Sequence, residues 1–293
     1  MEFKKISFED YEIINAFYQN YPARQCDRST AATIMWRNYY DNHYAIYDGT
    51  IIFSSNFTGE PCYTYPIGRN VDGMLDELAK YCKEKGTPMT LCGVNKDELP
   101  FVIAKYPGCT HSASRDWFDY LYEKDPTMLL AGRKYGTPRN HINKFKKLYP
   151  DYAFDIIDDS VTDKLIEFTK NFSFNSDKDE SAMKELEICI EVLKKREQYH
   201  MLGGYLHIGD KIVGYSFGEI IGDTLFVHIE KADVTFGGAY QMLTNSFLRT
   251  FAADDTVKFV NREEDCGDEG LRKSKLSYHP VELIEKNTVE IPL

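Results

Sequence analysis

The order of elements in the first half of the chain recurs in the second half, and this repeat constrains the fold more than any other feature. Each half has two apolar runs joined by a hairpin signal, then a third run, a glycine-containing turn, a helical pattern and a short strand. In the first half these segments lie at 43–48, 50–55, 62–67, 71–85 and 88–94. In the second half they lie at 204–208, 211–220, 224–231, 239–251 and 257–260. The order predicts an antiparallel meander followed by a parallel strand, because the helix returns over one face of the sheet.

Helical patterns also precede each meander. They lie at 10–18 and 31–39 in the first half and at 138–148, 161–172 and 181–195 in the second. A strand-like run at 117–122 closes the first half, so we expect a domain boundary near Lys124-Asp125-Pro126. The predicted fold class is α/β with mixed sheets, in two domains at residues 1–125 and 126–293.

Composition narrows the class of protein. With 43% hydrophobic residues the chain can fill a core, but no apolar run reaches the roughly 18 residues that a transmembrane helix needs. The N-terminus lacks the apolar segment of a signal peptide, so we expect a cytoplasmic protein. A net charge of −11 disfavours DNA as a partner. The seven cysteines include no C-x-x-C pair, which argues against a disulfide framework and against a structural zinc site.

A basic segment stands out in this acidic chain. Its cationic residues and one histidine are Arg133, Lys134, Arg139, His141, Lys144, Lys146 and Lys147. Helical spacing puts Ile142 and Phe145 on a buried stripe, with a broad basic face beside it. We interpret that face as binding the phosphates of tRNA, CoA or a lipid headgroup. An ordinary solvated helix face is the plainer alternative.

A glycine pair separates strand 224–231 from helix 239–251. A turn of this kind points free N–H groups and the positive end of the helix at its ligand, which suits a phosphate. Gly237, Gly238 and Ala239 are therefore candidates for binding the phosphates of a co-substrate, together with Arg139 and Lys144. A tight turn with no ligand is the alternative.

Strand 224–231 carries a candidate catalytic carboxylate. Its alternation puts His228 and Glu230 on one face, opposite the apolar residues of the run. A carboxylate or imidazole there can deprotonate or hold an attacking amine. Glu230 and, just past the strand end, Asp233 are the candidates. A hydrogen-bonded residue on an exposed strand face is the alternative, above all for His228.

The segment 261–280 has an acidic run followed by a basic one. The acids are candidates for binding a substrate amine: Glu263, Glu264, Asp265, Asp268 and Glu269. The bases are candidates for binding a phosphate or an oxyanion: Arg272, Lys273 and Lys275. Tyr278 and His279 are candidates for protonating a leaving group, and a final strand pair is expected at 281–284 and 288–291. The acids fit no EF-hand spacing, so no metal is expected; a solvated loop is the alternative.

The meander, glycine turn, helix and following strand resemble the GNAT acyltransferase fold. The pyrophosphate loop of that fold has the pattern Arg/Gln-x-x-Gly-x-Gly/Ala; Gly237 and Ala239 match it, and Val234 departs from it. Two such units in tandem resemble the FemABX-like aminoacyltransferases. Three segments, 133–152, 228–243 and 261–280, resemble the C-terminal domain of phosphatidylglycerol lysyltransferases, also catalogued as DUF2156.

The resemblance implies an acyl- or aminoacyltransferase. Its co-substrate would be aminoacyl-tRNA or acyl-CoA, with no tightly bound cofactor. Its acceptor would be an amine or hydroxyl, such as a lipid headgroup met by peripheral membrane contact. The first half has no Gly-Gly turn, so we expect it to have lost the transferase site. A non-catalytic module that binds a small ligand, or an accessory protein that binds tRNA, are the rival interpretations.

Overall fold

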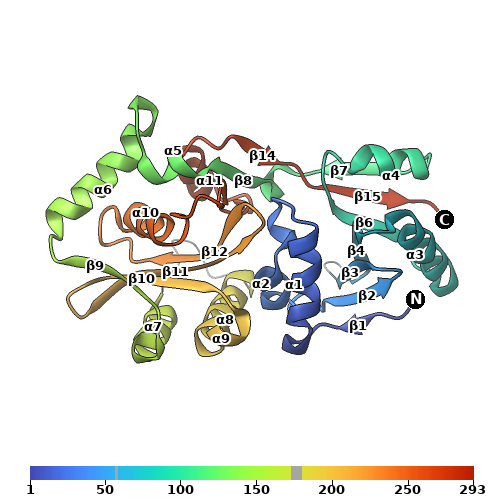
Figure 1. Cartoon of the computed structure of the whole chain (residues 1–293), viewed down its shortest axis with the longest axis horizontal. Coiled ribbons are helices and arrows are strands. Elements are labelled where there is room, and N and C mark those ends of the chain that lie inside the picture. Colours follow the sequence, from blue (N-terminus) through green and yellow to red (C-terminus); the bar gives the residue numbers. More distant parts are fainter. Residues whose placement is uncertain (57–58, 173–179) are drawn as a thin grey trace. The chain divides into compact units, whose positions relative to one another are not determined.

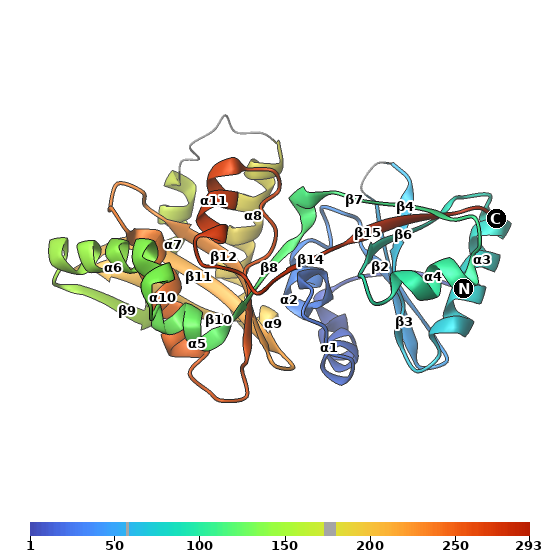
Figure 2. The ribbon, with the colours of Figure 1, turned by 90° about the horizontal axis from the view of Figure 1, so that it is seen from above.

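The computed structural model describes residues 1–56, 59–172 and 180–293, with side chains from 183 onward in the last range. The chain forms two compact units, each built around one sheet (Figures 1 and 2). Unit 1 consists of Met1–Asp119, Glu264–Asp268 and Leu283–Leu293. Unit 2 consists of Tyr120–Glu263 and Glu269–Glu282.

Unit 1 holds a mixed sheet in the order β1-β2-β3-β4-β6-β15-β7, with β5 paired to β3. Helix α3 begins at an Asn70 cap and ends at Gly86, whose φ of 67° is left-handed. One face of the sheet, with α3 and α4, forms an apolar core. The strands are β1 Lys4–Lys5, β2 His43–Tyr47, β3 Thr50–Asn56, β4 Pro61–Thr64, β5 Ile67–Gly68, β6 Met89–Val94, β7 Thr110–Ala113 and β15 Asn287–Ile291. The helices are α1 Tyr11–Asn20, α2 Thr30–Met35, α3 Val71–Lys85 and α4 Leu99–Lys105.

Unit 2 holds a sheet in the order β14-β8-β13-β12-β11-β10-β9. Helices α10, α5 and α6 cover one face and α7, α8 and α9 the other (Figure 1). Leu225 and Val227 of β12 pack on Phe247 and Leu248 of α10, which fixes this helix over the strand. The strands are β8 Asp119–Glu123, β9 Tyr152–Ile156, β10 Leu202–Ile208, β11 Lys211–Ile221, β12 Thr224–Ala232, β13 Phe259–Asn261 and β14 Glu282–Ile284. The helices are α5 Lys124–Leu129, α6 Gly136–Leu148, α7 Asp159–Asn171, α8 Glu180–Lys194, α9 Arg196–Tyr199, α10 Ala239–Phe251 and α11 Glu269–Leu276.

The repeated meander and crossover are confirmed. The predicted helices at 71–85 and 239–251 have the bounds of α3 and α10. Strand β4 runs parallel to β6, and β12 runs parallel to β13, as the crossover helices require.

The predicted pairing of the last two strands is wrong. Strand β14 lies beside β8 in the sheet of unit 2, whereas β15 pairs with β6 and β7 in the sheet of unit 1. The linker between them is Glu285-Lys286, and the Lys286 ammonium is bound to Asp119 at 2.7 Å and to Asp27 at 2.9 Å. These carboxylates hold the linker, and the ladders with β6 and β7 hold the strand that follows it in the sheet of unit 1.

Strands are exchanged between the two halves of the chain. Strand β8 belongs to the first half of the sequence but pairs with β13. Strand β15 belongs to the second half but lies between β6 and β7. The domain division at residue 125 stays a prediction, and a cut there would separate each of these strands from its sheet.

Candidate functional site

The glycine turn of unit 2 joins the end of β12 to the start of α10. Gly238, with a φ of 93°, is the N-cap of α10 and offers no capping side chain. A Cβ on Gly238 would lie 2.4 Å from the carbonyl oxygen of His141, so only glycine lets α6 pack this close. A Cβ on Gly237 would lie 3.9 Å from Lys144 Nζ. The structure therefore brings Gly237, Gly238, Ala239 and Lys144 together.

The corresponding turn in unit 1 precedes α3, and a side chain caps this helix. Asn70 caps α3 by accepting a hydrogen bond from Gly73 N at 3.0 Å. Arg69 forms an ion pair with Asp48 beside it. The first turn of α3 is thus partly satisfied by Asn70, and the loss of a transferase site in the first half stays a prediction.

A β-bulge in β12 decides which way the charged side chains of this strand point. The ladder with β11 pairs Phe217 with Ile229 and Gly218 with Val227, which leaves His228 as the extra residue. A bulge of this kind breaks the strict alternation of side chains along a strand. The side chains before and after the bulge therefore need not alternate regularly between the two faces of the sheet.

The prediction that His228 and Glu230 share one face of β12 is wrong. Glu230 accepts a hydrogen bond of 2.6 Å from Thr244 Oγ1 in α10. His228 stacks with Phe226, with the two rings 6° from parallel, while the residues flanking Phe226 pack against α10. The bulge thus directs Glu230 beneath α10 and His228 to the opposite face of the sheet.

On that opposite face, His228 is held between two carboxylates. Its Nε2 donates to Glu219 Oε1 at 3.0 Å and its Nδ1 donates to Glu263 Oε1 at 2.7 Å. Burial alone would lower the pKa of His228, but these hydrogen bonds raise it to about 10. The imidazole is therefore protonated at neutral pH and cannot serve as a base.

Beneath α10, Glu230 is paired with a buried arginine. Arg262 follows β13, and its Nη2 donates to Glu230 Oε2 at 2.6 Å while its Nε donates to the same oxygen at 3.2 Å. Thr244 binds the other carboxylate oxygen. Burial alone would lower the pKa of Arg262, but Glu230 raises it above its ordinary value. The guanidinium is therefore charged despite being only 6% exposed.

Three buried polar atoms around this ion pair have no hydrogen-bond partner among the described residues. They are Arg262 Nη1, the Tyr278 hydroxyl and the Ser216 hydroxyl. The Tyr278 ring centroid lies 5.0 Å from Arg262 Cζ, and Ser216 is the ladder partner of Glu230 in β11. Burial raises the pKa of Tyr278 to about 12. Such atoms are few in native proteins, and Nη1 can only donate, so this cluster suits an oxygen of a ligand or a water molecule.

Arg139, the other predicted phosphate-binding residue of α6, already has partners. Its Nη1 donates to the carbonyl oxygens of Leu130 at 2.6 Å and Gly132 at 2.8 Å. Leu130 caps α5 in a left-handed conformation, so Arg139 closes the end of that helix.

The three predicted bases of 272–275 lie on α11. Lys275 is buried, and its Nζ donates to the carbonyl oxygen of Arg262 at 2.5 Å, while its own carbonyl accepts from the Tyr122 hydroxyl. Lys275 therefore supports the backbone that carries Arg262. Arg272 is half-buried and Lys273 is exposed. The role of all three toward a phosphate stays a prediction.

The predicted catalytic residues other than Glu230 and Tyr278 lie in turns. Asp233 Oδ1 accepts from Thr235 N at 2.9 Å and from Thr235 Oγ1 at 2.6 Å, so it shapes the turn before α10. His279 is exposed, and its Nε2 lies 2.9 Å from the carbonyl oxygen of Lys134. Their catalytic roles stay predictions.

The acidic run does not gather in one place. Glu263 binds His228 in unit 2, whereas Asp265 is buried in unit 1 and accepts from Arg115 at 3.2 Å. Glu264 also belongs to unit 1, and the side chains of Asp268 and Glu269 are exposed. Binding of a substrate amine by the whole run stays a prediction.

Glu264 belongs to a buried cluster around a lysine. Lys286 Nζ lies 3.4 Å from Glu264 and 3.2 Å from Cys26 Sγ, in addition to its carboxylate partners Asp119 and Asp27. Among the described residues, Cys26, Asp119 and Glu264 are spaced closely enough to share a metal ion. The Lys286 ammonium already supplies the positive charge there, so the set fits a metal poorly.

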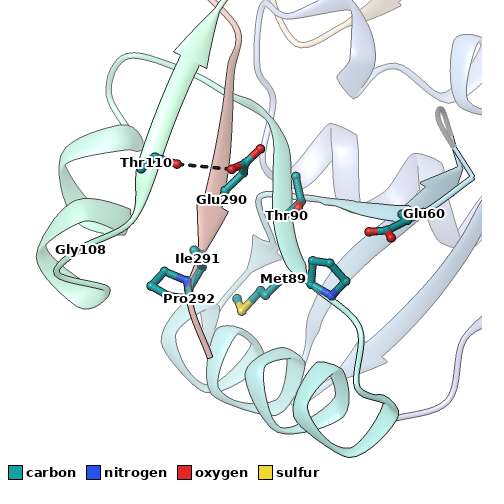
Figure 3. A pocket seen from close by; sticks show the side chains of 9 residues that line it. Glu60, Met89, Thr90, Gly108, Thr110, Glu290, Ile291 and Pro292 are labelled. Carbon is teal, nitrogen blue, oxygen red and sulfur yellow. Dashed lines mark hydrogen bonds between the residues drawn. The ribbon is translucent and has the colours of Figure 1, made fainter.

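Unit 1 also has an open pocket of about 480 Å³. Figure 3 shows Glu60, Thr90 and Glu290 around it, and the Thr110 hydroxyl donates to Glu290 at 3.4 Å. None of the predicted site residues lines this pocket.

Sequence reasoning missed three members of the clusters in unit 2. They are Glu219, Thr244 and Arg262. Arg262 carried a usable signal, because it directly follows the strand that pairs in parallel with β12 and alternates with the apolar Val260. Glu219 and Thr244 carried no such signal in the sequence. The role of Glu219 depends on the register of β11, and that of Thr244 depends on the rotation of α10 about its axis.

The chain is similar in sequence to a described family and to an uncharacterized protein. The family described as "Phosphatidylglycerol lysyltransferase, C-terminal" matches residues 18–289. An uncharacterized protein of Mycoplasmoides gallisepticum is 29% identical over 196 residues, which is 66% of this chain and 62% of that protein. This chain thus spans less than two thirds of the length of that relative.

Solved structures share the fold. A conserved protein of unknown function from Bacteroides thetaiotaomicron has a TM-score of 0.94 and 31% identity, with 100% of both chains covered. The structure of L-PGS from Bacillus licheniformis has a TM-score of 0.69 and 12% identity, covering 94% of this chain and 90% of that one. The predicted fold class, tandem GNAT-like units with mixed sheets, is confirmed. Within the described part of the chain, no helix is long and apolar enough to cross a membrane.

Proposed function

Because the chain belongs to the family of phosphatidylglycerol lysyltransferase C-terminal domains, we propose that it is a transferase that moves an aminoacyl or acyl group. The donor is aminoacyl-tRNA or acyl-CoA, and the acceptor is an amine or hydroxyl such as that of a lipid headgroup. The observation that carries the proposal is that α10 links the glycine turn at Gly237 and Gly238 to the buried Glu230–Arg262 pair.

The first end of α10 suits the donor phosphate. Gly238 provides no side-chain cap, and Lys144 lies beside Gly237. The Ala239 amide already donates to the carbonyl oxygen of Phe236 at 2.9 Å, so an anion here would use the amides that follow it in the first turn. The backbone amides, the dipole of α10 and the Lys144 ammonium would all attract an anion bound at the start of this helix. The missing Arg or Gln at Val234 removes one side-chain contact, whereas the backbone contacts of the turn remain.

The Glu230–Arg262 pair lies within reach of the glycine turn. Thr244 is six residues after Gly238, which on a helix corresponds to about 9 Å. Thr244 and Arg262 hold both oxygens of Glu230 in place. A carboxylate held in this way can position an attacking amine or hydroxyl, and the free Nη1 of Arg262 can stabilise the oxyanion that forms at the ester or thioester carbon.

Transfer in this site is direct. The acceptor nitrogen or oxygen attacks the donor carbonyl carbon, the bond to the tRNA ribose oxygen or CoA sulfur breaks, and the acceptor proton leaves to a base. His228 does not supply that base, because its pKa near 10 keeps it protonated. Glu230 is our candidate for it, and Tyr278 for returning a proton to the leaving group.

The proposal is tested by transfer assays on the purified protein. Charged tRNA mixtures and acetyl-CoA are offered as donors, with phosphatidylglycerol vesicles and a panel of amines as acceptors, and mass spectrometry detects products. We expect turnover with one donor class and a loss of at least a hundredfold in kcat/KM for Arg262→Met. Arg249→Met, on α10 but outside the cluster, is the control. Failure of isothermal titration calorimetry to detect binding of either donor would contradict the proposal.

A further inference from the structure

A stretch of unit 2 is free of acidic residues although the chain is acidic overall. Residues 126–150 contain no Asp or Glu, whereas the chain as a whole has 46 acidic and 35 basic residues. The same stretch holds the cations Arg133, Lys134, Arg139, Lys144, Lys146 and Lys147. Helix α6 runs through it, beside α10 in unit 2 (Figure 2). Such a local excess of positive charge marks a surface for a polyanion.

The lysines of α6 are available to a partner. Lys144, Lys146 and Lys147 are exposed, and none forms an ion pair within the part of the chain that the structure describes. The buried stripe of α6 is Pro138, Ile142 and Phe145, so Lys144 and Lys147 lie away from it and Lys146 lies at its border. By contrast, Lys184 of α8 pairs with Glu187, and Lys195, just after α8, pairs with Glu191.

Apolar side chains lie among these lysines. Leu148 follows Lys144 by one turn and is 52% exposed. Val234 is 56% exposed in the glycine turn, which Lys144 adjoins. Phe236 of the same turn packs on Tyr149 at 5.2 Å between ring centroids. The face therefore combines cations with protruding aliphatic side chains.

We propose that this face, defined by Lys144, Lys146, Lys147, Leu148 and Val234, docks unit 2 on an anionic lipid bilayer. Lysines contribute attraction to the headgroups, and aliphatic side chains enter the boundary with the acyl chains. The cations alone would also suit the phosphates of a polynucleotide, which a protein can bind without touching the bases. The protruding Leu148 and Val234 add nothing to a phosphate contact but can enter a lipid boundary, so the bilayer is the better fit.

Docking through this face would bring the proposed transferase site of unit 2 close to the bilayer. Lys144 belongs both to this face and to the turn before α10, so a docked bilayer would lie beside the donor-binding end of the site. This consequence rests on the proposed transferase function. The docking itself rests on charge and exposure alone, and binding is measured without turnover, so either can fail without the other.

The test is co-sedimentation of the protein with vesicles of phosphatidylcholine alone or with 30% phosphatidylglycerol. We expect binding to the anionic vesicles only, and weaker binding as salt rises. Each lysine near a surface contributes about a fivefold factor, so Lys144→Gln, Lys146→Gln and Lys147→Gln combined should weaken partitioning by about a hundredfold. Leu148→Asn should weaken it at every salt concentration.

The control removes the same charge from unit 1. Lys80→Gln, Lys83→Gln and Lys85→Gln alter three exposed lysines of α3, where Asp76, Glu77 and Glu84 intersperse the cations. This variant should bind anionic vesicles as the wild type does. Equal losses in the two triple variants would overturn the proposal. So would retention of bulk tRNA without retention on vesicles, which would assign the face to a polynucleotide.

Discussion

Two buried tyrosines of unit 2 differ in whether their hydroxyl is used. Tyr122 donates to the carbonyl oxygen of Lys275 at 2.9 Å, whereas the Tyr278 hydroxyl has no partner among the described residues. Their rings contact one another edge to face, so the two sites share one apolar environment. The pair therefore contrasts a hydroxyl that stabilises the fold with one that meets no hydrogen-bond acceptor among the described residues.

Tyr278→Phe should leave stability unchanged or raise it by up to about 1 kcal/mol, because it removes a buried hydroxyl that has no partner. Tyr122→Phe should cost about 1 to 2 kcal/mol, because it leaves a buried carbonyl unsatisfied. Urea denaturation measures both. If the Tyr278 hydroxyl serves transfer, kcat should fall at least tenfold in Tyr278→Phe only. An equal loss of stability in both variants would contradict this assignment.

The protonated His228 makes stability depend on pH. Its pKa of about 10 in the folded protein exceeds the ordinary value of 6.5, so its contribution is full below pH 6.5 and is lost as pH rises toward 10. The free energy of unfolding should fall by a few kcal/mol between pH 7 and pH 10, with the loss shared among Glu219, Glu263 and His228. Chemical denaturation across this range, with His279→Gln as the control for an exposed histidine, measures it. A histidine NMR titration with a midpoint near 6.5 at His228 would refute the argument.

At the scale of elements, the packing of α6 on α10 depends on one glycine. Gly238→Ala would put a Cβ 2.4 Å from the His141 carbonyl oxygen and force a left-handed φ on alanine. We expect a loss of about 2 to 4 kcal/mol, from strain and from the displacement of α6. Gly237→Ala meets only the flexible end of Lys144 at 3.9 Å and should cost under about 1 kcal/mol.

Thermal unfolding of the two glycine variants checks this difference. Both carry the same added methyl group one residue apart, so chain entropy changes alike. Equal destabilisation would mean that α6 yields easily and that the turn is no rigid platform. Phosphate or CoA binding, measured by calorimetry, should weaken in Gly238→Ala in step with the displacement of α6.

Elements were predictable where local pattern decides them. The periodicity of apolar residues specified α3 and α10, and the dipeptide Asp48-Gly49 specified the β2–β3 hairpin. The faces of β12 were not predictable, because a bulge depends on how β11 and β12 fit together and not on the sequence of either strand. The Glu230–Arg262 pair joins residues 32 positions apart and needed the register of β12 with β13.

At the scale of the whole molecule, the exchanged strands could not be read from the repeat. The repeat suggests two self-contained halves, but β15 completes the sheet of unit 1 and β8 that of unit 2. The segment 281–291 has the same alternating pattern whichever sheet it joins, so its place depends on long-range contacts: the ladders of β15 with β6 and β7 and the ion pairs of Lys286 with Asp119 and Asp27.

Fragments 1–125 and 126–293 should each be unfolded or aggregated when produced alone, and should regain the fold when produced together. Without β15 the strands β6 and β7 each lose a hydrogen-bonded neighbour, which leaves open edges. Circular dichroism and size-exclusion chromatography of the fragments, singly and mixed, test this. Cooperative unfolding of fragment 1–125 by itself would show that β15 is dispensable.

The position of β15 in the sheet of unit 1 also affects how the chain folds during synthesis. More than 170 residues separate the end of β7 from the start of β15, and both strands lie in one sheet. At about 5 to 20 residues per second, the ribosome needs roughly 10 to 35 s to make that stretch. During this interval the nascent N-terminal sheet has β6 and β7 without the strand between them. Chaperone contact with the growing chain should therefore persist until residue 291 has emerged, well after the N-terminal segment has left the exit tunnel.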